Sequence, residues 1–315
     1  MNRRKALLIM GVTAVCAGFV ATLSHATAPG TNGRIAFQRY RLHDAPYQAE
    51  IFTVNSDGSG ERKVTRVARG LHDDFPDWAP DGSRIVFQRC GGPRCQIWSV
   101  LPDGRGLNRL SPSCPHRPGL LKCADNSEPV YSPNGRHIAF SADEVLMVAD
   151  ANLRHAHPVG RGYEPGWSPD GKWLAFVWKP GNRSAVFVEN VDGTGRHRIT
   201  PFRLRAGDHP DWSPDGTRIL FSTARHGRGN LFTVRPDGTG LRQLTHFRGL
   251  TNVENGSFSP DGESIVFATV VGAVNPPGAT LDDVFVMSAD GTDIRPVTRA
   301  RNWDGSPDWG PSRSQ

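Results

Sequence analysis

The sequence has little that would hold the protein in a membrane, since beyond residue 28 no apolar run is long enough to span a bilayer. It also has no cluster of lysine and arginine residues with interleaved aromatic residues, of the kind that binds nucleic acid. The formal net charge of +6 includes Arg3, Arg4 and Lys5, and without these three residues 34 basic side chains face 31 acidic ones. We therefore expect a surface of mixed charge and no nucleic-acid partner.

The sequence lacks the signature of a hydrolase as well. A Gly-x-Ser-x-Gly nucleophile elbow is absent, because the nearest string, residues 166–170, ends in Asp170 and its Ser168 belongs to a repeated turn. The eleven histidines form no His-Glu-x-x-His motif, and we expect His155 and His157 to be exposed. The sequence therefore assigns no catalytic residue, and an enzyme is the less favoured alternative.

The first 28 residues have the three-part pattern of a secretory signal peptide. A positive segment at residues 2–5 precedes an apolar stretch at residues 6–23, and Ser24-His25-Ala26 fits a cleavage site. We predict a signal peptide at residues 1–26 and an exported mature protein in the periplasm, the cell envelope or the extracellular space. The alternative is an uncleaved membrane anchor, because about 18 apolar residues is the lower limit for spanning a bilayer.

Cysteine is scarce, with five residues, and its placement agrees with export. Cys16 lies in the predicted signal peptide, which leaves Cys90, Cys95, Cys114 and Cys123. The simplest pairing joins neighbours, Cys90 with Cys95 and Cys114 with Cys123, and an oxidising compartment permits both disulfides. The alternative is a metal site that includes His116, although these spacings do not match the usual zinc patterns.

One phrase recurs six times and predicts the fold. An aromatic residue precedes Ser-Pro-Asp-Gly or a close variant, and the aromatic positions lie 36 to 53 residues apart, at Trp78, Tyr131, Trp167, Trp212, Phe258 and Trp309. Proline, aspartate and glycine make this phrase a turn. An apolar run, an alternating strand, an Asp-Gly turn and a last strand ending in Val-Thr or Leu-Thr follow. Periods near 40–50 residues with four strands are typical of β-propeller blades.

The sixth copy lacks its apolar run, which we expect to come from the other end of the chain. Asn32-Gly-Arg-Ile-Ala-Phe37 matches the segment that follows the turn in the complete copies. We therefore predict an all-β, six-bladed β-propeller over residues 32–312, with four antiparallel strands per blade. The N-terminal strands pair with the C-terminal strand, and this closure removes exposed sheet edges. The copy that begins at Tyr131 has Asp150 to Asn152 in place of Asp-Gly, and its outer strands are expected at Val145–Val148 and Pro158–Val159.

The repeats, which read Trp-Ser-Pro-Asp-Gly-x-x-Ile-x-Phe, then Asp-Gly and Leu-Thr, resemble the WD-like repeats of the TolB propeller family over residues 32–312. The resemblance implies the fold, while the function is open because propellers have many roles. TolB-type proteins carry an α/β domain ahead of the propeller, which docks partners in the Tol–Pal envelope system. Only a few residues separate the predicted cleavage site from the first repeat, so we expect that domain to be absent here.

The inner strand of each blade lines the central channel of a propeller, and the residues before each repeat aromatic enter that strand at the channel mouth. The positions three and four residues before the aromatic are rich in polar and acidic side chains. We predict a ligand site there, formed by Asp74, Glu128, Glu164, Asp208, His209 and Glu254. Convergent carboxylates suit a hard cation such as calcium. The competing interpretation is that these side chains only stay solvated in a wet channel. We expect the recurring turn residues Asp81, Asp170, Asp215 and Asp261 to be structural.

Two functions follow. The first is a binding module that holds a protein, peptide or glycan at the channel mouth or on the long loops at residues 39–50, 90–96, 111–127 and 270–282. The second is an extracellular propeller hydrolase or lyase with a divalent metal in the channel. We expect a monomer without a cofactor unless the channel binds calcium, and the membrane is a partner only if the N-terminal segment stays uncleaved.

Overall fold

The computed structural model describes residues 30–41, 48–91, 94–111, 125–223, 229–248, 251–271, 283–299 and 302–313. Within these ranges the regular structure is strands plus one short 3-10 helix, η1 (Phe202–Leu204). None of the described helices is long and apolar enough to cross a membrane. The predicted signal peptide, the pair Cys114–Cys123 and most of the long loops proposed for partner contacts lie outside the described residues.

The strands form antiparallel units of four, each named here by its inner strand. The strands of the β24, β4 and β8 units are, from the inside outward, β24 (Trp303–Pro311), β1 (Asn32–Tyr40), β2 (Ala49–Val54) and β3 (Arg62–Lys63); β4 (Leu71–Trp78), β5 (Ile85–Gly91), β6 (Cys95–Val100) and β7 (Asn108–Arg109); and β8 (Asn126–Tyr131), β9 (His137–Ala142), β10 (Val145–Asp150) and β11 (His157–Arg161).

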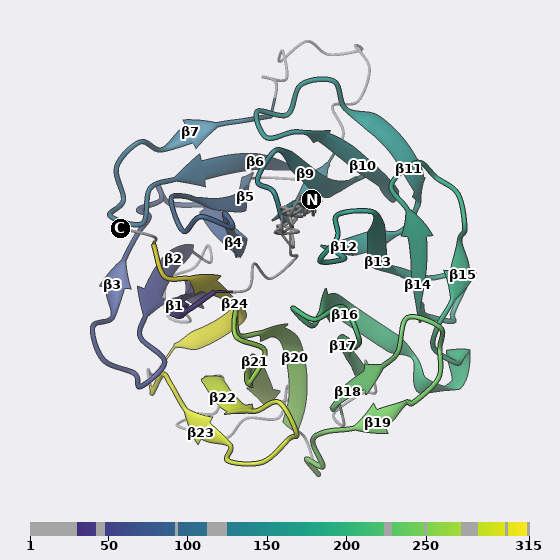
Figure 1. Cartoon of the computed structure of the whole chain (residues 1–315). Coiled ribbons are helices and arrows are strands. Elements are labelled where there is room, and N and C mark those ends of the chain that lie inside the picture. The colour runs from purple at the N-terminus through teal and green to yellow at the C-terminus, as the bar shows by residue number, and fades with distance from the viewer. Residues whose placement is uncertain are drawn as a thin grey trace, which may run out of the picture.

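The second half of the chain repeats the pattern. The strands of the β12, β16 and β20 units are β12 (Tyr163–Trp167), β13 (Trp173–Trp178), β14 (Ala185–Asn190) and β15 (His197–Arg198); β16 (Ala206–Trp212), β17 (Ile219–Thr223), β18 (Leu231–Val234) and β19 (Arg242–Gln243); and β20 (Thr251–Phe258), β21 (Ser264–Val271), β22 (Val284–Ser288) and β23 (Arg295–Pro296). Figure 1 shows the units around a common axis, with β4, β12, β16, β20 and β24 toward the middle and short strands such as β15 and β19 at the periphery.

The two ends of the described chain lie side by side. β1 pairs antiparallel with β24, and the partners include Ile35 with Trp309 and Tyr40 with Trp303. The β24 and β4 units also share a parallel bridge between Ala49 and His72. The first strand in the described sequence therefore completes its unit with the last one, and the prediction of an all-β chain of four-stranded antiparallel sheets is confirmed.

The core forms where the second strands of the units face their neighbours. Because side chains alternate along a strand, the apolar run Ile-x-Phe places two large side chains on one face. Those phenylalanines are fully buried or nearly so, at Phe37, Phe87, Phe140, Phe176, Phe221 and Phe267. Each inner-strand aromatic is buried as well, which accounts for its recurrence in the sequence.

The repeated Val-Thr or Leu-Thr pair has a hydrogen-bonding role. In five units its hydroxyl accepts the backbone N–H of a third-strand residue or its neighbour, as Thr65 Oγ1 does from Ile51 at 2.9 Å and Ser111 Oγ from Ile97 at 2.7 Å. The fourth strand ends just before this pair, at Lys63 in the β24 unit rather than at Thr65 as the sequence predicted. The Thr or Ser hydroxyl thus takes the place of a backbone carbonyl as the hydrogen-bond acceptor where the pairing of the third and fourth strands stops.

The aspartates of the Ser-Pro-Asp-Gly turns are structural, as the sequence predicted. Asp170 Oδ1, for example, accepts hydrogen bonds from Ser168 Oγ at 2.6 Å and from Lys172 N at 3.1 Å. Such local bonds explain why aspartate recurs at this position in four of the five complete repeats, with asparagine, Asn134, in the fifth. The predicted disulfide between Cys90 and Cys95 is also present, and it joins directly opposite residues of β5 and β6.

Candidate functional site

Every inner strand carries an irregularity at the same place. The residue three positions before the repeat aromatic has a positive φ in each unit, between 40° and 56°, at Phe75, Glu128, Glu164, His209, Asn255 and Ser306. The strand pairing shifts register at these positions. A positive φ costs a non-glycine residue about 1–3 kcal/mol. Such residues persist where the surrounding structure holds the backbone in place, and they are concentrated at ligand sites and active sites.

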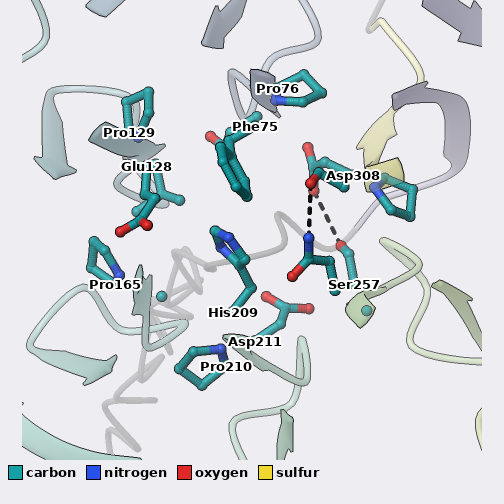
Figure 2. A pocket seen from close by; sticks show the side chains of 17 residues that line it. Phe75, Pro76, Glu128, Pro129, Pro165, His209, Pro210, Asp211, Ser257 and Asp308 are labelled. Carbon is teal, nitrogen blue, oxygen red and sulfur yellow. Dashed lines mark hydrogen bonds between the residues drawn. The ribbon is translucent and has the colours of Figure 1, made fainter. Parts of the chain in front are cut away.

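Five of these six residues come together around one cavity between the inner strands. A cavity of about 70 Å³ is lined by Phe75, Glu128, His209, Asn255 and Ser306 together with the residues that follow them (Figure 2). Of the six predicted ligand residues, Glu128 and His209 line this cavity directly, while Asp74, Asp208 and Glu254 lie one residue earlier along their strands. A cavity of this size holds a few waters or one ion, but not a sugar or peptide chain.

Glu128, Glu164 and His209 come together. One ligand atom from each of these side chains lies within 4.8 Å of the others. The Nε2 atom of His209 is buried and has no hydrogen-bond partner among the described residues. Two carboxylates and an imidazole are a ligand set that suits manganese or zinc better than the calcium predicted from carboxylates alone.

The two glutamates also join neighbouring units. Glu128 Oε2 accepts hydrogen bonds from Glu164 N at 2.8 Å and from Ser141 Oγ at 2.9 Å, and Glu164 Oε2 accepts one from His209 N at 2.9 Å. Glutamines do the same elsewhere, since Gln38 accepts from Phe75 N and Gln88 from Glu128 N. Part of the role of these carboxylates is therefore structural, and in two other units a neutral amide from the second strand fills the same role.

Burial and mutual repulsion dominate the electrostatics of the cluster. Burial, reinforced by the charge of Glu164, raises the pKa of Glu128 to about 8, and burial also raises the pKa of Glu164. The pKa of Asp208 is raised by burial and by Glu164. Burial lowers the pKa of His209 to about 4, so the imidazole is neutral at pH 7. The exposed Lys179 is the cation that acts on all four groups.

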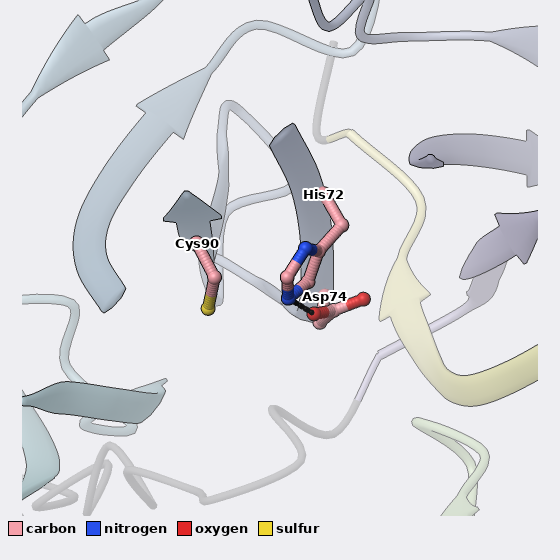
Figure 3. Close-up of side chains that lie close together, drawn as sticks. All are labelled: His72, Asp74 and Cys90. Carbon is pink, nitrogen blue, oxygen red and sulfur yellow. Dashed lines mark ion pairs between the residues drawn. The ribbon is translucent and has the colours of Figure 1, made fainter. Parts of the chain in front are cut away.

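Asp74 occupies a separate corner of the mouth. Its Oδ1 accepts the Tyr40 hydroxyl at 2.7 Å, and its Oδ2 lies 3.5 Å from His72 Nε2. Burial raises its pKa to about 6. Figure 3 shows His72, Asp74 and Cys90 close together, but the Cys90 sulfur is in the disulfide with Cys95 and offers no thiolate.

The sequence interpretation missed three aspartates deeper in the channel. Asp77, Asp211 and Asp308 directly precede the repeat aromatic, and each accepts the backbone N–H of an aromatic in another unit: Tyr131 at 2.8 Å, Phe258 at 2.7 Å and Trp78 at 2.7 Å. Burial and the neighbouring Asp308 raise the pKa of Asp77, and burial raises that of Asp308 to about 6. The signal was the thrice-repeated Pro-Asp-Trp.

Comparison with known proteins agrees with this architecture. Residues 146–315 match the TolB beta propeller domain. The chain belongs to this family. A putative TolB from Agrobacterium tumefaciens has a similar structure, with a TM-score of 0.66 at 19% identity over 87% of this chain and 92% of that one. At this identity the likeness shows the fold alone.

Two further similarities involve lyases. The oligogalacturonide lyase of Pectobacterium atrosepticum is 26% identical over 180 residues, which is 52% of this chain and 46% of the lyase. A structure of oligogalacturonate lyase in complex with manganese matches with a TM-score of 0.51 at 15% identity, covering 86% of this chain and 74% of that one. The chain thus spans less than half the length of the curated lyase it matches.

Proposed function

We propose that this chain is an exported, closed six-bladed propeller whose acidic channel mouth binds a protein or peptide through a cationic group. The observation that carries the proposal is the cluster of Glu128, Glu164 and Asp208. Burial raises the pKa of all three groups, and the charge of Glu164 raises those of Glu128 and Asp208 further. A bound lysine or arginine side chain would compensate these charges, and binding would be linked to a fall in their pKa values. Lys179 does not occupy the place of such a bound cation, because its side chain is exposed rather than buried within the cluster.

Export is supported by the disulfide between Cys90 and Cys95, because disulfides persist in oxidising compartments. The size of the cavity supports a surface contact over a substrate chamber. The cavity has a volume of about 70 Å³, so a partner would place one side chain into the mouth and the rest of the partner would stay outside. The similarity to a putative TolB structure is consistent with a protein partner.

Site-specific photo-cross-linking tests this proposal. A photoreactive residue at Ser127, beside the mouth, should capture a protein from envelope extracts, and the same group at the exposed Thr217, in a turn at the other end of the strands, should not. Adding Asp208→Asn should reduce capture from Ser127, whereas Glu263→Gln, an equal charge change in an exposed turn, should leave it unchanged. Equal capture from both positions, or capture indifferent to Asp208, would overturn the proposal.

A second candidate function is metal-dependent cleavage of an acidic polysaccharide. It is supported by the ligand geometry of Glu128, Glu164 and His209 and by the similarity to a lyase with manganese. Three protein ligands leave positions open on a metal, as catalytic sites do. Elemental analysis of the purified protein, and calorimetric titration of manganese after chelation, test this candidate. Stoichiometric metal that Glu164→Gln removes would favour it, and failure of manganese to bind would rule it out.

A further inference from the structure

The units are sealed against one another by glycines at the end of the strands opposite the channel mouth. In five units a glycine of the turn after the third strand has a positive φ and faces a backbone carbonyl of the preceding unit. A Cβ at these glycines would lie 2.7–3.2 Å from that carbonyl oxygen: Gly58 faces Val297, Gly104 faces Val64, Gly193 faces Val159, Gly238 faces Ile199 and Gly291 faces Leu244. The close approach depends on the missing side chain.

The β8 unit breaks this rule. Its turn is Asp150-Ala151-Asn152-Leu153, and Leu153 has φ 57° and donates its N–H to Asp150 O at 2.8 Å, as Gly104 does to Leu101 O. Leu153 therefore holds the place of the sealing glycine. A leucine cannot make the same approach to Leu110 of the preceding β4 unit, because its Cβ would meet the carbonyl.

A cleft of about 510 Å³ lies at the junction of the β4 and β8 units, lined by Leu110, Ala151 and the nearby turns. Its volume is within the range of small-molecule sites. It is distinct from the channel cavity, with which it shares no lining residue. The apolar floor comes from Leu110 and Ala151, and the polar groups come from both units.

Two more departures of the β8 unit from the repeat line the same cleft. Tyr131 replaces the usual tryptophan and brings a hydroxyl, and Asn134 replaces the usual turn aspartate and removes a negative charge. Asn134 Oδ1 accepts Ser132 Oγ and Arg136 N, both at 2.9 Å, which leaves its amide nitrogen as a donor. Burial raises the pKa of Tyr131 to about 12, so its hydroxyl stays protonated and can donate.

Arg84 supplies the positive charge of the cleft. The equivalent Arg34 uses Nε and Nη1 for Thr53 Oγ1 at 3.1 Å and Asn55 Oδ1 at 2.8 Å. In the β4 unit Leu101 stands where Asn55 does, and Arg84 bonds only through Nη2, to Ser99 Oγ at 3.0 Å and Gly106 O at 2.8 Å, among the described residues. The guanidinium therefore keeps donors on its remaining edge.

We propose that the cleft between the β4 and β8 units binds the carboxylate of a small polar molecule, with Arg84 as the charged donor and Asn134 and Tyr131 as neutral donors. A guanidinium edge matches a carboxylate with two parallel hydrogen bonds. Asp81 also lines the cleft, but it is exposed and its Oδ1 accepts Ser83 N–H at 2.9 Å. The carboxylate can belong to a sugar acid or to the C-terminus of a short peptide.

Calorimetric titration of the purified protein with four probes tests the proposal. Sodium glucuronate and acetyl-alanyl-alanine carry the carboxylate, and glucose and acetyl-alanyl-alanine amide are their uncharged counterparts. We expect at least one acid to bind about 10-fold more tightly than its counterpart, and the stronger acid identifies the source. If neither acid binds better than its counterpart, the proposal is wrong.

Variants locate the binding. Arg84→Gln should weaken the acid about 10-fold, a loss typical for a charge-assisted hydrogen-bond pair, while Arg218→Gln at the equivalent position of the β16 unit should not. Ala151→Phe should also abolish binding by filling the cleft while leaving the bonds of Arg84 in place. If the Arg84→Gln variant fails to fold, the binding measured with the Ala151→Phe variant decides whether the proposal holds. Unchanged binding in Ala151→Phe, or equal loss in Arg218→Gln, would overturn the proposal.

Discussion

The rings of Phe75 and His209, from β4 and β16, stack in the channel with their centroids 4.6 Å apart and their planes at 30° (Figure 2). Both residues have a positive φ, so the two inner strands are bent to bring these side chains together. The stacked rings line the same cavity as Glu128, and the aspartates Asp77, Asp211 and Asp308 line it as well. The stack therefore takes up part of the space between the inner strands next to the cluster of Glu128, Glu164 and His209.

Removing this stack should destabilise the protein and widen the cavity. Phe75→Ala is expected to lower the free energy of unfolding by about 1–3 kcal/mol, less than for a fully buried phenylalanine because Phe75 is partly exposed. A double-mutant cycle with His209→Ala in urea unfolding should give a coupling of about 0.5–1.5 kcal/mol, the value typical of aromatic pairs. Additive effects of the two substitutions would show that the contact contributes nothing.

The hydrogen bond from His209 N to Glu164 should tolerate an amide but not a methyl group. Glu164→Gln keeps an acceptor and removes a buried charge, so we expect a melting temperature at least equal to that of the wild type. Glu164→Ala leaves the buried N–H without its partner and should cost about 1–3 kcal/mol. Gln88→Ala is the matched control, because Gln88 fills the same role toward Glu128. If Gln and Ala at position 164 are equally harmful, the charge rather than the acceptor is what matters.

Stability should fall as the pH rises from acid to neutral. Burial raises the pKa of Asp308 to about 6 in the folded chain, against about 3.9 when unfolded. The folded state thus holds the proton of Asp308 more tightly than the unfolded state does. The resulting contribution to the free energy of unfolding is fully present below about pH 4 and is lost as the pH rises through about 6.

Asp308→Asn keeps an acceptor for Trp78 N and should reduce the decline in unfolding free energy between pH 4 and pH 7 by roughly 2 kcal/mol. Urea unfolding at a series of pH values measures this slope, with Asp237→Asn, in an exposed turn, as the control. An unchanged slope would mean that Asp308 is ionised throughout.

The disulfide between Cys90 and Cys95 should contribute little. It closes a short loop between directly opposite strand residues, so the gain is expected at or below the lower end of the usual ~2–4 kcal/mol. Replacing both cysteines by serine should shift the melting temperature by a few degrees at most, which calorimetry measures. A collapse of cooperative unfolding in this variant would show that the β5–β6 hairpin depends on the bond.

The repeat made the strands and the row of channel residues predictable, because turn and strand chemistry is local to each unit. Glu128 and His209 were found by counting back from the aromatic. The roles of Asp77 and Asp308 were not found, because these carboxylates accept hydrogen bonds from backbone N–H groups of other units. Which backbone group a side chain contacts in another unit cannot be read from one sequence. The cleft beside Arg84 was missed because its lining residues come from two units, and the sequence showed the turn that contains Leu153 only as irregular.

The most direct test of the proposed acidic binding mouth is calorimetric titration with tetralysine at low ionic strength. The account predicts binding that the double variant Asp208→Asn, Glu254→Gln weakens about 10-fold, as expected for the loss of two close charge contacts, and that Glu263→Gln leaves unchanged. Tetraglutamate should not compete with tetralysine for this site. If tetralysine binds the double variant as tightly as the wild type, or binds neither, the channel mouth is not the cationic site and the account is contradicted.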